Sequence, residues 1–148
     1  MTGFANILLP TDFSDCARPA YGLAAQIAER FSSKLFLLHV VQDLTLLMPD
    51  AVLFAASPNE ALDSLIAGAK TQLEQIVRQH QLERFTLTLQ VQVGSPAVEI
   101  VEYAKEINAS LIVIATHGRT GLQQLLLGSV ANRVVQVAPC PVLTVRSQ

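Results

Sequence analysis

The stretch Leu111-Ile112-Val113-Ile114-Ala115-Thr116-His117-Gly118-Arg119-Thr120-Gly121 decides the fold, and it runs on through Gly128-Ser129 to Val137. An apolar run enters a polar loop that contains glycines, and the loop ends at Gly128-Ser129, where a helical pattern begins. Glycines let backbone amides approach a ligand closely, and the start of a helix offers unpaired N–H groups and the positive end of its dipole. The stretch therefore predicts a strand, an anion-binding loop and a helix, with phosphate as the natural ligand.

The composition indicates one domain with an aliphatic core. A chain of 148 residues can bury such a core without metals or disulfides. Hydrophobic residues make up 51% and aromatic residues 5%, which favours a parallel sheet covered on both faces. Cys16 and Cys140 lie far apart without metal-binding spacing, and we interpret both as free thiols.

Charge and hydropathy exclude several classes of partner. The formal net charge is -2 and the basic residues are scattered, whereas binding to nucleic acid relies on clustered Lys and Arg. No run approaches the roughly 18 to 20 apolar residues of a membrane span, and the first residues lack the pattern of a signal peptide. We therefore expect a cytoplasmic protein that binds neither nucleic acid nor membranes.

Strand-length apolar runs alternate with helical periodicity along the whole chain. The expected strands are 6–9, stopped by Pro10, then Lys34–Val41, 85–93, 110–115 and Val142–Val145. The expected helices are 17–31, 59–81, one that begins at Pro96 and ends near Asn108, and Ser129–Val137. The strictly alternating run 85–93 predicts a half-exposed edge strand. Residues 42–58 have no clear period but are apolar, so they are either a flap, a contact with another subunit, or a loop packed on its own core.

Capping residues and buried faces follow from the same patterns. The expected N-caps are Ser14 or Asp12 for the first helix, Asn59 for the second and Ser95 for the third. The periodicity places Phe31 and Leu65 on the buried faces of their helices.

Regular alternation predicts an open, doubly wound parallel sheet, which binds ligands beyond the carboxyl ends of its strands, where the strand order reverses. The polar tips Pro10-Thr11-Asp12, His39-Val40-Val41 and Ala115-Thr116-His117-Gly118 all fall at carboxyl ends and should meet around one crevice. Phosphates would lie against Gly118 and the Gly128-Ser129 helix start. Asp12 suits a ribose hydroxyl, and Val40 offers an apolar wall and backbone groups to a purine.

Phosphate contacts alone do not supply enough affinity. A helix terminus contributes ~0.3 to 1 kcal/mol, up to about 2 in favourable geometry, whereas micromolar binding needs roughly 8 kcal/mol. Backbone N–H groups, the Ser129 hydroxyl and a pocket for base and sugar must therefore contribute. The alternative is that the loop glycines merely permit turns and Asp12 merely caps a helix. Arg119 is either a phosphate clamp or a solvated cation.

Other site types find little support in the sequence. His39 and His117 could face each other across the crevice, but two histidines without a third ligand make a poor metal site. His80 is expected to be solvated. The chain lacks the G-x-x-x-x-G-K-[ST] loop, a G-x-G-x-x-G after its first strand and the G-x-S-x-G elbow, and no catalytic carboxylate pair or Ser-His-Asp set is visible.

Over essentially its whole length the chain resembles a universal stress protein of the ATP-binding kind. The nucleotide motif of that family is a glycine, two residues, a glycine, nine residues, and Gly followed by Ser or Thr. Here it reads Ala115-Thr116-His117-Gly118, nine residues, then Gly128-Ser129, so the first glycine is replaced by Ala115. Two further stretches carry the resemblance, Ile7-Leu8-Leu9-Pro10-Thr11-Asp12-Phe13-Ser14 and Leu37-Leu38-His39-Val40.

The resemblance implies a Rossmann-like, single-domain fold over residues 1–148, with sheet order 3-2-1-4-5 and a homodimer formed through Val142–Val145. It further implies that Asp12 contacts the ribose, Val40 the adenine and the glycine-serine loop the phosphates of ATP, often with a divalent ion such as Mg or Mn. The expected nucleotide-binding residues are Pro10, Thr11, Asp12, Val40, Ala115, His117, Gly118, Arg119, Gly128, Ser129 and Val130. The Ala115 methyl group costs little if the position only donates its backbone and has ordinary dihedral angles, but it would obstruct a close phosphate approach or a positive φ. We expect ordinary dihedral angles, since the other matching positions are intact.

The expected function is a dimeric, ATP-binding regulatory protein of the stress response, whose bound nucleotide alters its surface for protein partners. One alternative is a slow ATP hydrolase or phosphotransferase, although no catalytic base is evident. Another is a nucleotide-free dimerisation module, for which Ala115 is the best clue.

Overall fold

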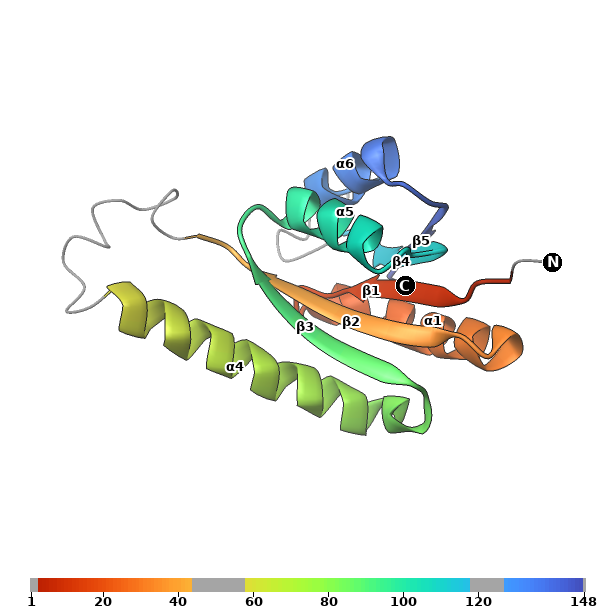
Figure 1. The fold of residues 1–148 in the computed structure, drawn as a ribbon, viewed down its shortest axis with the longest axis horizontal. Coiled ribbons are helices and arrows are strands. Elements are labelled where there is room, and N and C mark those ends of the chain that lie inside the picture. Colours follow the sequence, from red (N-terminus) through yellow and green to blue (C-terminus); the bar gives the residue numbers. More distant parts are fainter. Residues whose placement is uncertain (1–2, 44–57, 118–126, 148) are drawn as a thin grey trace.

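The computed structural model describes residues 3–43, 58–117 and 127–147. Five strands form one sheet in the order β3-β2-β1-β4-β5, and all four pairings are parallel (Figure 1). The strands are β1 (Asn6–Pro10), β2 (Lys34–Val41), β3 (Leu87–Val93), β4 (Leu111–Ala115) and β5 (Val142–Val145). The doubly wound parallel fold and the predicted strand order are therefore confirmed.

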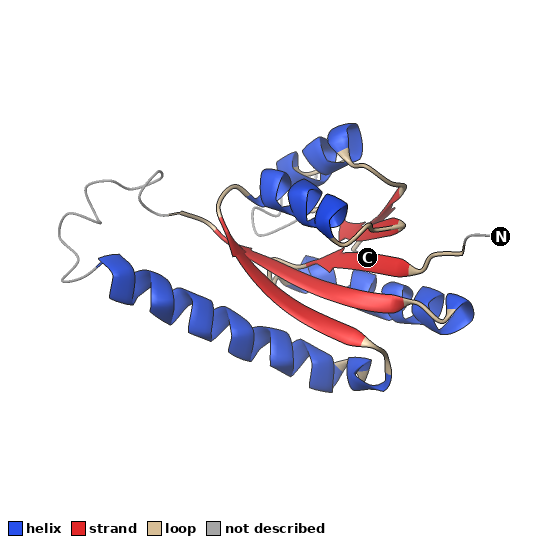
Figure 2. Cartoon of the chain, in the orientation of Figure 1, coloured by secondary structure: helices blue, strands red, loops and turns tan. Residues whose placement is uncertain are grey.

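Helices cover both faces of the sheet (Figure 2). α1 (Arg18–Phe31) and α4 (Pro58–Gln79) pack on one face, and α5 (Pro96–Glu106) and α6 (Ser129–Val137) pack on the other. Side chains alternate between these faces, so Ile7 and Leu9 point to the α1 side while Leu8 points to the α5 side, and all three are fully buried. This double coverage explains why the central strands are continuously apolar.

Backbone groups along β1 alternate between its two neighbours. The Ala5 carbonyl accepts a hydrogen bond from the first residue of β2, and the Asn6 carbonyl accepts one from the residue that precedes β4. Even-numbered residues of β1 therefore face β4. Pro10 has no N–H to donate on that side, and the β1–β4 register ends at Leu8. The prediction that the first strand ends at Pro10 is confirmed, and Pro10 itself is the last residue of β1, paired with Leu38 of its other neighbour, β2.

Two helices begin elsewhere than predicted. The expected helix 17–31 is preceded by a 3-10 turn, Asp15–Ala17, so that α1 itself starts at Arg18. Asn59 lies inside α4, which starts at Pro58, so the prediction of Asn59 as its cap is wrong. Boundaries of this kind depend on the last one or two hydrogen bonds of a helix, which periodicity does not encode.

Other helix predictions are confirmed, and two buried-face predictions are wrong. Ser95 is the N-cap residue of α5, and Pro96 is the first residue of the helix. Asn108 adopts a left-handed φ of 49° just past the end of α5. Phe31 is 42% exposed, at the last turn of α1, and Leu65 is 44% exposed. A helix of 22 residues is about 33 Å long, whereas a strand of 7 residues spans about 23 Å, so α4 extends beyond the β3 strand it covers.

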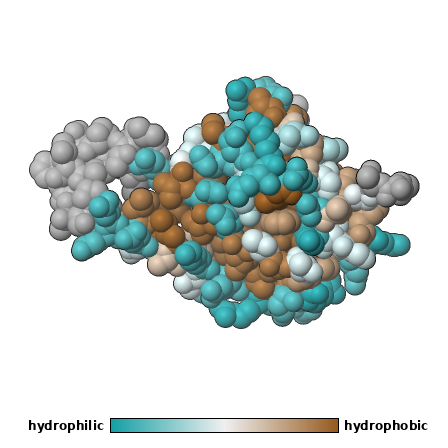
Figure 3. Space-filling view, in the orientation of Figure 1, coloured by the Kyte–Doolittle hydropathy of each residue, from teal (hydrophilic) through white to brown (hydrophobic). Residues whose placement is uncertain are grey.

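The strand β3 lies at an edge of the sheet, as its alternating sequence predicts. Thr88 and Leu89 are exposed, and the rest of the strand is half-buried. In the space-filling view, hydrophobic surface is seen over the region where Figure 1 draws α4 beside β3 (Figure 3).

Candidate functional site

The end of β1 is anchored by Thr11, a polar residue that is buried. Its N–H donates to the Leu38 carbonyl at 2.8 Å, which extends the β1–β2 ladder past Pro10. Its hydroxyl shares a hydrogen bond with the Tyr21 hydroxyl of α1 and accepts one from the Phe13 amide at 3.0 Å. Burial raises the pKa of Tyr21, and the bond to Thr11 acts in the opposite direction. The neutral phenol is therefore the form that anchors Thr11 to α1.

Asp12 begins the turn that leads from β1 toward α1. Its Oδ1 atom accepts hydrogen bonds from the Ser14 amide at 2.9 Å and from the Ser14 hydroxyl at 2.6 Å. Ser14 precedes the 3-10 turn Asp15–Ala17 but makes no side-chain capping bond there, and the N-cap residue of α1 is Ala17. The prediction of Ser14 or Asp12 as the cap of the first helix is therefore wrong, because the two side chains bond to each other in a local turn.

Phe13 and His39 support this turn, and sequence analysis did not identify their contact. Phe13 has a left-handed φ of 66°, a conformation that costs a non-glycine residue about 1 to 3 kcal/mol. Its ring stacks on the buried His39 ring, with centroids 4.0 Å apart and planes at 26°. His39 Nδ1 donates to the Thr11 carbonyl at 2.8 Å. The sequence contains no signal for a left-handed phenylalanine, and it places His39 at a strand end without indicating this contact.

Ala115, the departure from the expected glycine, fits its position without strain. It is the last residue of β4 and pairs with Val145 of β5. It is not among the four non-glycine residues with positive φ in the described part of the chain. Its methyl group packs against the core cluster on the α1 side. The expectation that Ala115 has ordinary dihedral angles is therefore confirmed.

Thr116 connects β4 to its neighbours and to the start of α6. Its N–H donates to the Val145 carbonyl at 2.9 Å, and its own carbonyl accepts from the Gly128 N–H at 2.5 Å. Its side chain is buried and bonds to Nδ1 of the half-buried His117 at 3.0 Å. The Gly128 bond fixes the N-terminus of α6 against the carboxyl end of β4.

The first turn of α6 presents backbone amides to this end of the sheet. Gly128 is the N-cap residue, with an ordinary φ of -66°. The first intrahelical bond is donated by Asn132 to the Gly128 carbonyl at 2.9 Å, so the amides of residues 129–131 have no acceptor within the helix. Ser129 is exposed and Val130 is half-buried. Such a helix start favours an anion.

Val40 lies near the end of β2, on the strand next to β1. Its side chain is 8% exposed and belongs to the core on the α5 side. Even-numbered residues of β2 face β1, because Lys34 donates to the Ala5 carbonyl. The last hydrogen bond of the β1–β2 ladder runs from the Thr11 N–H to the Leu38 carbonyl. The backbone groups of Val40 therefore point toward the β1 side, beyond the end of this ladder.

The structure thus places most of the predicted site residues on the carboxyl side of the sheet. Pro10, Thr11 and Asp12 follow β1, Val40 lies on β2, Ala115 and His117 end β4, and Gly128, Ser129 and Val130 start α6. β1 and β4 are neighbours whose following helices lie on opposite faces, so the strand order reverses between them. Gly118, Arg119 and Gly121 lie outside the described residues, as do residues 44–57 of the apolar segment 42–58.

His80 is half-buried, so the prediction that it is solvated is wrong. Its ring lies edge-on to Tyr21 of α1, with centroids 4.9 Å apart. Burial lowers the pKa of His80, and the charge of Arg18 lowers it further. Sequence periodicity could not reveal this contact, because it depends on how α1 and α4 lie against each other.

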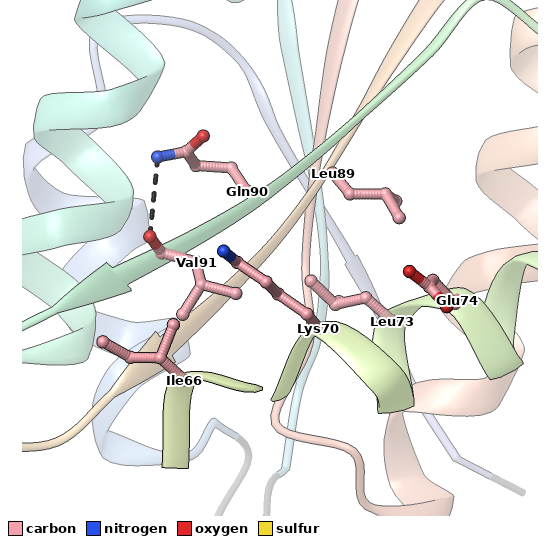
Figure 4. Close-up of a pocket in the computed structure, with 7 residues that line it drawn as sticks. All are labelled: Ile66, Lys70, Leu73, Glu74, Leu89, Gln90 and Val91. Atoms are coloured by element: carbon pink, nitrogen blue, oxygen red, sulfur yellow. Dashed lines mark hydrogen bonds between the residues drawn. The ribbon is translucent and has the colours of Figure 1, made fainter. Parts of the chain in front are cut away.

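A separate groove lies between α4 and β3, at the sheet edge (Figure 4). Its volume is about 390 Å³, and the Gln90 amide donates to the Val91 carbonyl at 3.5 Å beside it. Its lining residues are Ile66, Lys70, Leu73, Glu74, Leu89, Gln90 and Val91. None of them is a predicted nucleotide-binding residue, so this groove is separate from the strand ends where the nucleotide site is predicted.

Several further features bear on function. Within residues 3–43, 58–117 and 127–147, no three or more His, Cys, Asp or Glu side chains gather as a metal site would require. In the same ranges no helix combines the length and hydropathy needed to cross a membrane. Cys16 and Cys140 are free thiols, as predicted, and burial raises the pKa of Cys140, which disfavours the reactive thiolate.

Comparison with known proteins supports the resemblance seen in the sequence. The family model described as universal stress protein family matches residues 3–146. The universal stress protein MJ0531 of Methanocaldococcus jannaschii is 35% identical over 97% of this chain and 82% of its own length. The solved structure of universal stress protein UspA from Lactobacillus plantarum has a TM-score of 0.83 and 33% identity, over 99% of this chain and 100% of that chain.

Two more distant structures were solved with nucleotides. One is a universal stress protein in complex with cAMP, with a TM-score of 0.72, and the other is the Archaeoglobus fulgidus protein in complex with dAMP, with a TM-score of 0.68. Each is 23% identical and spans 99% of this chain and 100% of that chain, a likeness that establishes the fold alone. The family model, by contrast, matches nearly the whole sequence, with the phosphate-loop spacing and the strand ends described above. The chain therefore belongs to the universal stress protein family.

Proposed function

We propose that this protein binds an adenine nucleotide, ATP, in the crevice at the carboxyl ends of β1 and β4. The observation that carries the proposal is the bond from Gly128 to the Thr116 carbonyl. It fixes the amides of residues 129–131 at the point where the strand order reverses, which is where doubly wound sheets bind their ligands. The amides and the Ser129 hydroxyl would contact the phosphates.

The other strand ends supply the remaining contacts. Asp12 would accept a hydrogen bond from a ribose hydroxyl, with Pro10 and Thr11 holding its turn at the end of β1. Val40 would contact the adenine through its backbone groups, which point beyond the β1–β2 ladder. Ala115 and His117 would line the approach to the phosphates. The relatives solved with cAMP and dAMP lend support to adenine as the base.

A divalent ion would be held mainly by the nucleotide. The described residues offer no cluster of three ligands, and Mg²⁺ is commonly bound by substrate phosphates and water with one or two protein oxygens. Asp12, two residues past the end of β1, would be one such oxygen ligand.

We further propose a homodimer formed by the free edge of β5. The carbonyls of Pro141 and Val145 accept bonds from β4, so the backbone groups of Val142 and Thr144 face outward. Those groups suit antiparallel pairing with the same strand of a second copy. A dimer of this kind gives the protein a surface that bound nucleotide can alter, in keeping with a regulatory role.

Isothermal titration calorimetry with Mg-ATP tests the binding proposal. We expect saturable heat with one nucleotide per chain, weaker binding of Mg-GTP, and loss of binding in the double variant Asp12→Ala, Ser129→Ala. Phe31→Ala is the matched control, because Phe31 is exposed on α1 and contacts Phe4. No heat and no thermal shift with wild-type protein at millimolar Mg-ATP would overturn the proposal. Native mass spectrometry of the purified protein reports any retained nucleotide and the oligomeric state together.

A further inference from the structure

The turn that carries Asp12 is held at both ends by one side chain of the neighbouring strand. The His39 ring stacks on Phe13 with centroids 4.0 Å apart, and its Nδ1 lies 2.8 Å from the Thr11 carbonyl. A carbonyl oxygen can only accept a hydrogen bond, so Nδ1 carries the proton in this arrangement. His39 therefore contacts the residue before Asp12 and the residue after it.

We propose that His39 is a positioning residue for the nucleotide site, holding the 11–14 turn so that Asp12 faces the ribose. The inference rests on the proposed nucleotide-binding function. Neither His39 nor Phe13 is among the residues expected to contact the nucleotide, so both act through Asp12.

The backbone of Phe13 shows why the turn needs support. A residue other than glycine adopts a φ of 66° only where surrounding contacts hold its backbone there. The ring stack on His39 is one such contact, and the bond from the Phe13 amide to the Thr11 hydroxyl is another. Ser14 can donate both of its bonds to Asp12 Oδ1 because the chain bends at residue 13.

Variants at His39 separate its two contacts. His39→Phe keeps an aromatic ring against Phe13 but removes the donor to the Thr11 carbonyl. His39→Asn keeps a donor near the position of Nδ1 but removes the ring. Each is expected to weaken Mg-ATP binding by about threefold to tenfold, the usual range for one ring pair or one hydrogen bond. His39→Ala loses both contacts and is expected to weaken binding more than either.

Variants at Phe13 test the backbone conformation itself. Phe13→Gly loses the stack, but glycine adopts positive φ without strain. Phe13→Ala loses the stack and keeps the strain. If the turn shape matters for binding, the glycine variant binds Mg-ATP more tightly than the alanine variant. If Phe13 contributes only packing, the two bind alike, or the more flexible glycine variant binds more weakly.

Two measurements on the full chain decide the matter. Calorimetry gives the dissociation constant for Mg-ATP, and hydrogen exchange of the amides of residues 13 and 14 reports the turn in ligand-free protein. Support requires weaker binding and faster exchange in His39→Ala, with urea unfolding and Phe31→Ala as controls for general loss of stability.

The outcomes keep this inference separate from the proposed function. If wild-type protein binds Mg-ATP and His39→Ala binds it with the same dissociation constant, the proposed role of His39 is overturned. Nucleotide binding itself then stands. If wild-type protein does not bind Mg-ATP, the proposed function fails and the assigned role of His39 toward the nucleotide fails with it. Exchange at residues 13 and 14 then still shows whether His39 holds the turn.

Discussion

The backbone N–H of Gly128 donates to the carbonyl of Thr116 and so joins the start of α6 to the end of β4. This bond joins the two ends of the motif that the sequence predicts to bind phosphate. Because both partners are backbone atoms, the geometry of the helix start does not depend on a side chain. Substitutions at this end of the sheet should therefore change ligand contacts more than the fold.

Ser129→Ala should weaken Mg-ATP binding by about tenfold to 150-fold, because a hydrogen bond to a charged group contributes roughly 1.5 to 3 kcal/mol. Ser129→Thr keeps the hydroxyl and should bind within about threefold of wild type. Calorimetry measures both dissociation constants. Equal affinity of all three proteins would remove the Ser129 hydroxyl from the site.

Ala115→Gly should lower the free energy of unfolding by about 1 kcal/mol and leave nucleotide affinity unchanged. Glycine weakens a strand entropically by roughly 0.5 to 1 kcal/mol, and the change also removes a methyl group that packs on the α1 side. Urea unfolding and calorimetry on the same samples check the two parts. Tighter nucleotide binding in the glycine variant would mean that the Ala115 methyl group obstructs the ligand.

His80→Gln should make the free energy of unfolding depend less on pH below pH 6.5. Burial lowers the pKa of His80 below its usual 6.5, so between that lowered pKa and 6.5 the unfolded chain binds more protons than the folded one. Its contribution to stability is present above pH 6.5 and is lost as the pH falls through the folded-state pKa. Urea unfolding of both proteins across this pH range measures how the free energy of unfolding changes with pH. An identical pH dependence in His80→Gln would contradict the prediction.

Thr144→Pro should convert the proposed dimer into a folded monomer. The N–H of residue 144 faces away from β4, so proline removes a donor from the free edge and spares the internal ladder. Leu143→Pro, which removes an N–H that faces β4, should instead destabilise the fold. Light scattering gives the molar mass and circular dichroism the folded state. A dimeric Thr144→Pro protein would place the interface elsewhere.

The strands were predictable because the central ones are buried on both faces and read as unbroken apolar runs, as Lys34–Val41 does. Local chemistry was equally informative at Ser95-Pro96, which starts α5, and at Asn108, which tolerates the left-handed conformation just past its end. These signals are contained within a few neighbouring residues.

The features that escaped prediction depend on contacts between distant segments. His80 is half-buried because α1 places Tyr21 beside it. Leu65 is exposed because α4 is longer than β3, which no helical period reveals. The stack of Phe13 on His39 joins the end of one strand to the next and requires a backbone angle that phenylalanine rarely adopts. Asp12 and Val40 could be placed at strand ends, but what orients them could not.

Pro10 has a consequence for the end of the sheet at which we propose the nucleotide site. Two adjacent parallel strands tend to stay paired as long as both have donors and acceptors to exchange, yet β1 leaves β4 after Leu8 while continuing beside β2. The proline nitrogen at the end of β1 carries no hydrogen, so β1 cannot donate a further ladder hydrogen bond to β4 at that position. The point at which the β1–β4 ladder ends is therefore set by the covalent structure of one residue, and it requires no ligand.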